Sequence, residues 1–136
     1  MIELILAAQI FLVTNVQCGD VPANGCFTTY SRGDDRIIQV KDIEYEWQKY
    51  WTLYHEQGHN LMRDDYKVPD LFQGEEYRAN AFAFWLVQNK YPQNGSWYAK
   101  GSPEDLYFSE ICKDDCKKMI LDIDLSTYKV VDKIKI

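Results

Sequence analysis

The sequence is short of positive charge and of long apolar runs. Its 136 residues include 15 Lys and Arg against 21 Asp and Glu, a net charge of −6. Because such a chain has little basic surface to hold a phosphate backbone, nucleic-acid binding is not expected. The apolar N-terminal segment is too short to predict a membrane span. With 46% hydrophobic residues, the chain can form one core, so we expect a single domain over residues 1–136.

Paired cysteine motifs are also missing. The four cysteines contain no Cys-x-x-Cys pair, so neither a zinc ribbon nor a thioredoxin-type redox site is supported. An even count allows disulfides in three pairings, and it equally allows four reduced thiols. A metal site built from all four is a further alternative. The residues concerned are Cys18, Cys26, Cys112 and Cys116.

Residues 1–16 are largely apolar but contain no Lys or Arg, and they include Glu3. A secretory signal peptide normally begins with positive charge and ends at a small-x-small cleavage site. We therefore interpret this segment as part of the folded domain, which favours a cytoplasmic protein. The secreted alternative stays open, because it would explain the cysteines as disulfides.

Strand patterns come first along the chain and helix patterns follow. Three short runs rich in β-branched residues, 10–16, 26–31 and 36–41, predict strands in an antiparallel meander. Residues 128–136 alternate enough to predict a last strand. Strands followed by helices are typical of the α+β class.

Three helices are expected. Asp42 is the predicted N-cap of the first, and its apolar residues recur at helical spacing to form one buried stripe. This stripe is Ile43, Trp47, Tyr50, Trp51, Tyr54, Gly58, Leu61 and Met62. The second helix runs from Gly74 or Glu75 to about Lys90 and is apolar nearly all round, which predicts a central position. The third begins with Ser102 as N-cap and Pro103 at the first helical position, and continues to Ile120.

The first helix carries the motif His55-Glu56-Gln57-Gly58-His59, which contains both histidines of the chain. Residues four apart lie on one face of a helix, so both imidazoles can bind one ion, and zinc suits them. Glu56 lies beside the ion, where it can take a proton from a zinc-bound water. Gly58 would allow close packing behind the site.

A catalytic zinc needs a third protein ligand, and with no further histidine this must be a carboxylate or a thiolate. Glu76 is the best candidate, because a loop of suitable length brings the first turn of the second helix to His59. Asn80 lies one turn later on the same face, where it can hydrogen-bond a ligand.

His55-Glu56-Gln57-Gly58-His59 followed by Glu76-Tyr-Arg-Ala-Asn-Ala-Phe-Ala83 resembles the gluzincin class of zinc metallopeptidases, and especially ImmA/IrrE-type peptidases. The resemblance covers residues 26–88. It implies a minimal zincin-like fold, in which a small antiparallel or mixed sheet packs on the motif helix and a second helix carries a ligand. It further implies one Zn²⁺ per chain held by His55, His59 and Glu76, with Glu56 as general base. A neighbouring strand, 36–40, would offer its edge to an extended peptide.

A competing alignment also exists. Residues 55–65 resemble the metzincin pattern, in which Asp65 takes the place of the third ligand, although the glycine of that pattern is missing. Tyr77, Tyr91 or Tyr98 could stabilise an oxyanion, with little to separate them.

The function predicted from the sequence is hydrolysis of peptide bonds in a peptide or protein substrate by a zinc metallopeptidase. One alternative is a zinc-binding interaction or regulatory protein of the same fold without peptidase activity. Another is a secreted, disulfide-bonded binding domain in which the histidines are incidental.

Overall fold

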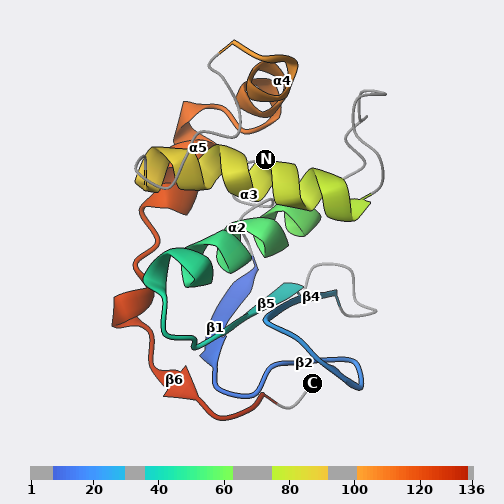
Figure 1. Cartoon of the computed structure of the whole chain (residues 1–136), viewed down its shortest axis with the longest axis vertical. Coiled ribbons are helices and arrows are strands. Elements are labelled where there is room, and N and C mark those ends of the chain that lie inside the picture. Colours follow the sequence, from blue (N-terminus) through green and yellow to red (C-terminus); the bar gives the residue numbers. More distant parts are fainter. Residues whose placement is uncertain (1–7, 30–35, 63–74, 92–100, 135–136) are drawn as a thin grey trace.

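The computed structural model describes residues 8–29, 36–62, 75–91 and 101–134. Across these ranges the chain is a mixed α+β protein with four α-helices and a small mixed sheet, which confirms the predicted class. Figure 1 shows helix α2 (Glu46–Met62) between the sheet and helix α3 (Glu75–Lys90). Helices α4 (Pro103–Ile111) and α5 (Asp114–Leu121) pack on α3. None of the helices in the described ranges has the length and apolarity needed to cross a membrane.

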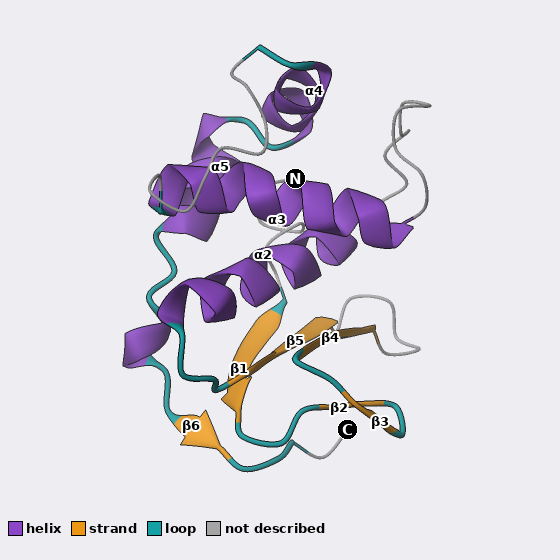
Figure 2. Ribbon diagram, viewed as in Figure 1, coloured by secondary structure: helices purple, strands orange, loops and turns teal. Residues whose placement is uncertain are grey.

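The sheet has the strand order β4-β5-β1-β6 (Figure 2). Its strands are β1 (Gln9–Val13), β4 (Gly25–Thr29), β5 (Arg36–Lys41) and β6 (Val130–Val131). Strand β5 runs antiparallel to β4 on one side and parallel to β1 on the other. The predicted meander is therefore wrong, because β1 and β4 are not neighbours. Between them the chain forms a small hairpin of β2 (Gln17–Cys18) and β3 (Val21–Pro22), which lets β4 reach the far edge of β5.

The predicted final strand is much shorter than expected. Among the described residues of this segment, Val130 and Val131 alone form a strand, parallel to β1, and a 3-10 turn, η2 (Leu125–Thr127), precedes them. The backbone N–H of Leu125 donates to the hydroxyl of Tyr50 in α2, at 2.9 Å. This bond ties the C-terminal segment to the central helix.

Helix α2 begins three residues later than predicted, at Glu46, so Asp42 is not its N-cap. The backbone N–H of Asp42 donates to the carbonyl of Val13, and its carboxylate lies 3.5 Å from Lys49 Nζ. Asp42 therefore joins the sheet to the helix instead of starting it. Of the predicted stripe, Tyr50, Tyr54 and Leu61 are buried, whereas Trp47 is 36% exposed near the N-terminus of α2.

Helix α3 matches its prediction and is largely buried. The rings of Phe82, Trp85 and Phe108 meet at centroid distances of 5.3–5.8 Å, which makes an aromatic centre between α3 and α4. At the start of α4 the hydroxyl of Ser102 accepts from the backbone N–H of Asp105, and Pro103 follows it, so the predicted cap is confirmed.

The predicted third helix is in fact two helices. Helix α4 ends at Ile111, and the chain leaves helical geometry at Cys112 before α5 begins at Asp114. A disulfide joins Cys112 to Cys116 across this break. The other two cysteines also pair, Cys18 with Cys26, so no free thiol remains and a metal site built from all four is excluded.

Candidate metal centre

The two histidines come from consecutive turns of α2 and point to the same place. Their Nε2 atoms lie 3.2 Å apart, and their rings meet edge to face at a centroid distance of 4.8 Å. Both side chains are only 12% exposed. The ring of His55 also stacks on Trp51, one turn earlier, at 5.3 Å. Packing therefore holds His55 in one orientation.

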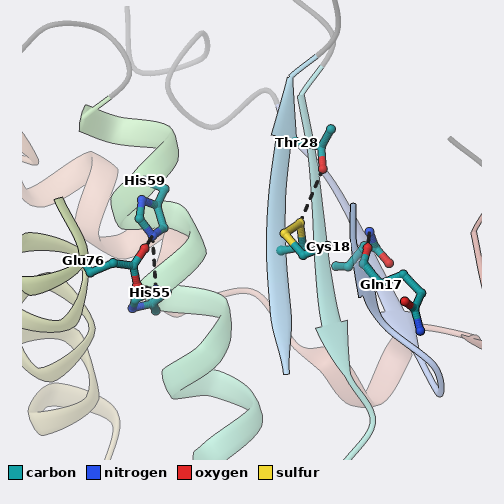
Figure 3. The surroundings of a disulfide bond; sticks show 8 residues. Gln17, Cys18, Thr28, His55, His59 and Glu76 are labelled. Carbon is teal, nitrogen blue, oxygen red and sulfur yellow. Dashed lines mark hydrogen bonds and ion pairs between the residues drawn. A yellow bond between two sulfur atoms is a disulfide. The ribbon is translucent and has the colours of Figure 1, made fainter. Parts of the chain in front are cut away.

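Glu76 reaches the same point from the first turn of α3 (Figure 3). Its two carboxylate oxygens lie 3.3 Å from His55 Nε2 and 2.8 Å from His59 Nε2. In a tetrahedral site with bonds of roughly 2.0–2.1 Å, neighbouring donor atoms are about 3.3 Å apart. The observed separations of 2.8–3.3 Å fit that geometry, so His55, His59 and Glu76 could hold a metal ion.

Gly58 makes this convergence sterically feasible. A Cβ atom at this position would lie 3.1 Å from the Cα of Ala79 and 3.3 Å from Phe82. Because glycine costs about 1 kcal/mol in a helix interior relative to alanine, its presence needs a compensating gain. That gain is the close approach of α2 and α3, as the sequence predicted, and it brings the first turn of α3 within reach of both imidazoles.

Glu56 lies next to the first histidine and is only 6% exposed. Burial raises the pKa of Glu56 to about 7, while His59 acts to lower it and Glu76 to raise it. A group with a pKa near neutrality can both accept and return a proton. Its carboxylate faces β4: a Cβ atom at Gly25 would lie 2.9 Å from Glu56 Oε2. Strand β4 therefore passes directly over the proposed base.

The burial of His55 favours its neutral form. Burial lowers the pKa of His55, and the neighbouring His59 lowers it further, although Glu76 and hydrogen bonding from Asn80 and Glu76 oppose this. Metals bind the neutral form of imidazole, because one of its nitrogens then has a free lone pair. The buried Nδ1 atom of His55 has no hydrogen-bond partner of normal geometry. Asn80, the residue predicted to support a ligand, is close enough to this ring to raise the pKa of His55.

Glu75 is a site residue that the sequence interpretation missed. Its Oε1 lies 3.0 Å from Nδ1 of His59, on the other side of the ring from Glu76. The sequence placed it only at the start of a helix, where an acid has an ordinary role in stabilising the helix dipole. The signal that could have revealed it was its position beside the proposed ligand Glu76.

A cleft of about 290 Å³ joins the ligands to the sheet. One wall is helical and contains the two histidines and three acidic residues, and the other consists of strands β2 and β4. Its lining residues are Cys18, Gly25, Cys26, Phe27, His55, Glu56, His59, Glu75 and Glu76. Figure 3 shows the ligand side chains on the helix side and the Cys18 disulfide on the strand side.

The strand facing the ligands differs from the one predicted. Strand β5 (Arg36–Lys41) pairs with neighbours on both sides, so its edges are already occupied. The edge strand is β4, which also contributes Gly25, Cys26 and Phe27 to the cleft. The strand that lines the cleft therefore lies one position further out in the sheet than the strand named from the sequence.

Two of the remaining candidates, Tyr91 and Tyr77, do not line the cleft. Tyr91 packs against Tyr50 at the far end of α3, and the exposed Tyr77 is not a lining residue. Asp65 and Tyr98 lie outside the described residues. The alternative third ligand Asp65 thus stays a prediction, whereas Glu76 is brought to both imidazoles.

Comparisons of the chain with protein-family models, curated proteins and solved structures find no match. The resemblance to gluzincins therefore stays a prediction. The geometry that bears on function consists of three convergent donor atoms, a buried carboxylate beside them and a cleft with an edge strand.

Proposed function

We propose that this protein is a zinc-dependent metallopeptidase with a minimal zincin-like architecture of the gluzincin type. One observation carries the proposal: Nε2 of His55, Nε2 of His59 and the carboxylate of Glu76 converge at metal-ligand spacing beside the buried Glu56. Three protein donors leave one position of a tetrahedral ion open, which distinguishes catalytic from structural zinc sites.

The donor set favours zinc but does not by itself specify it. Two imidazoles and one carboxylate suit zinc, and they also occur in non-haem iron oxygenases. Glu56 supports hydrolysis, because a buried carboxylate next to the ion is needed to move protons from water. Nothing in oxygen chemistry requires that group.

Glu56 is the proposed general base. Zinc, when bound, polarises a carbonyl group and lowers the pKa of water to about 7. Glu56 accepts a proton from the attacking water and then returns it to the nitrogen of the leaving amine. The burial that raises the pKa of Glu56 to about 7 in the metal-free chain supports this two-way transfer.

Strand β4 is the proposed binding site for the substrate backbone. It lies at one edge of the sheet and, together with β2, forms the wall opposite the ligands. An extended peptide can hydrogen-bond to such an edge as an added strand, which would hold its scissile bond over the ligands. The cleft volume of about 290 Å³ suits a short peptide segment.

The variant Glu56→Gln tests the mechanism. It keeps the size of the side chain and removes the base, so we expect one zinc per chain by elemental analysis and a loss of turnover of at least about 100-fold. Glu110→Gln, which alters an exposed acid of α4, is the matched control and should behave like the parent. Peptide-library cleavage with and without a chelator gives the activity.

Three results would contradict the proposal. Parent-like turnover in Glu56→Gln would remove the base from the mechanism. Zinc content unchanged in His55→Ala, His59→Ala and Glu76→Ala would remove the metal centre, and iron in place of zinc would change the reaction class.

A zinc-binding interaction protein is the second candidate. It is favoured by one observation: none of the described cleft residues is a tyrosine, an arginine or a third histidine that could stabilise an oxyanion. A parent protein that holds one zinc per chain and cleaves no member of a broad peptide library would support this candidate over the peptidase.

A further inference from the structure

Glu75 and Glu76 hold opposite sides of one imidazole. Glu75 Oε1 lies 3.0 Å from Nδ1 of His59, while Glu76 Oε1 lies 2.8 Å from Nε2 of the same ring. The two acids are consecutive residues in the first turn of α3. One helix terminus therefore supplies both a metal-ligand candidate and a contact to the ligand beside it.

The contact at Nδ1 selects a tautomer. In a neutral imidazole one nitrogen carries the proton and the other carries the lone pair that binds a metal. In the metal-free ring the carboxylates of Glu75, at Nδ1, and Glu76, at Nε2, compete for this proton. A carboxylate accepts hydrogen bonds and cannot donate them, so when an ion lies between Nε2 and Glu76, Glu75 favours the proton on Nδ1. The lone pair then lies on Nε2, the atom 3.2 Å from Nε2 of His55. This is the tautomer that the candidate metal centre needs.

The two histidines are held in different ways. His55 stacks on Trp51, and its Nδ1 is buried without a hydrogen-bond partner of normal geometry. His59 has the carboxylate of Glu75 at the corresponding atom. Loss of Glu75 should therefore affect the orientation of one ligand and leave the other in place.

We propose that Glu75 is a positioning residue that fixes the tautomer and orientation of His59 as a metal ligand. The inference rests on the proposed function, because it presumes the metal centre. The side chain of Glu75 is 59% exposed, so it contributes little to the core. Its loss should appear in metal binding more than in the stability of the metal-free protein.

Zinc affinity of the full-length chain, measured by competition with a chromophoric chelator, tests the inference. We expect Glu75→Ala to bind zinc about 10–100-fold more weakly than the parent, as is typical for the loss of such a partner. Glu75→Gln should be intermediate, because its amide oxygen still accepts the N–H but carries no charge. With Co²⁺ in place of zinc, the visible absorption bands of Glu75→Ala should shift.

Asp114→Ala is the matched control, since Asp114 is an exposed acid in the first turn of α5. It should bind zinc like the parent, and metal-free Glu75→Ala should melt no lower than this control. Equal zinc affinity in the parent and Glu75→Ala, or an equal loss in Asp114→Ala, would overturn the inference and leave the proposed function standing. A parent protein that binds no zinc would overturn both.

Discussion

At the scale of single residues, Gly25 sets the distance between the edge strand and the proposed base. A Cβ atom there would lie 2.5 Å from Cγ2 of Thr52 and 2.9 Å from Oε2 of Glu56, closer than real Cβ contacts allow. Only a residue without a side chain permits β4 to lie this near α2. The geometry of Glu56 thus depends on a strand that the sequence did not connect to it.

The variant Gly25→Ala should lower kcat by at least about tenfold, because a displacement of even 1 Å at a catalytic group is costly. It should also lose about 1–3 kcal/mol of stability, as overpacked sites do. Zinc content should be unchanged, since no metal ligand is displaced. Steady-state kinetics measure kcat, and elemental analysis of the same preparation measures the zinc content.

The double variant Gly25→Ala/Thr52→Ser separates the two clashes. It removes the methyl group at 2.5 Å but keeps the contact with Glu56. Part of the lost stability should return while kcat stays low. Recovery of kcat together with stability would show that Glu56 had not been displaced.

The sequence was informative where spacing alone places side chains. His55 and His59 share a face because they are four residues apart on one helix, and no tertiary information is needed to see it. Glu76 required the added argument that zinc needs a third ligand. Glu75 and Gly25 were missed because their roles depend on which atoms meet across two elements, and local spacing does not contain that information.

At the scale of elements, the approach of α2 to α3 brings the ligands together. The variant Gly58→Ala should separate these helices, because its Cβ would press on the backbone of Ala79, which cannot rotate away. Helix propensity alone would stabilise this variant by about 1 kcal/mol. We expect instead a loss of about 1–3 kcal/mol, as is usual for overpacking.

Thermal unfolding with and without zinc measures the effect of Gly58→Ala on the site itself. Zinc that binds only the folded state raises the melting temperature, and the rise increases with the logarithm of the zinc affinity. The zinc-induced rise should be smaller in the variant than in the parent, because α3 carries Glu76. A variant as stable as the parent, with an undiminished rise, would contradict this account.

Elements were predicted better than their arrangement. Helix α3 and the Ser102-Pro103 start of α4 follow from apolar pattern and capping residues. Strand order does not, because β1 and β4 have similar patterns and only tertiary packing decides which side of β5 each one joins. The break at Cys112 has neither Gly nor Pro to mark it, so the sequence pattern predicted one continuous helix across this position.

At the scale of the whole molecule, the two disulfides differ in their distance from the candidate site: one lines the cleft and the other does not. Cys18–Cys26 lines the cleft and joins β2 to β4, whereas Cys112–Cys116 spans the break between α4 and α5. The loops they close are short, with sequence separations of 8 and 4. Each should stabilise the fold by a comparable amount, about 2–3 kcal/mol.

Replacing each cysteine pair by serine should therefore give similar losses of stability but different losses of activity. Cys18→Ser/Cys26→Ser should lower kcat/KM, because Cys26 follows Gly25 in the strand that lies over Glu56. Cys112→Ser/Cys116→Ser should leave kcat/KM close to that of the parent at temperatures where both variants are folded. Equal effects of the two pairs on kcat/KM would contradict the distinction.

The exposure of the cleft disulfide makes the proposed enzyme sensitive to its chemical surroundings. Cys18 is exposed while Cys26 is only 3% exposed, so a reductant in solution meets the first sulfur before the second. Disulfides persist in oxidising compartments and are reduced where glutathione is abundant. A metallopeptidase with a disulfide in its cleft would lose peptidase activity on entering a thiol-rich environment, without any inhibitor and without release of its metal ion.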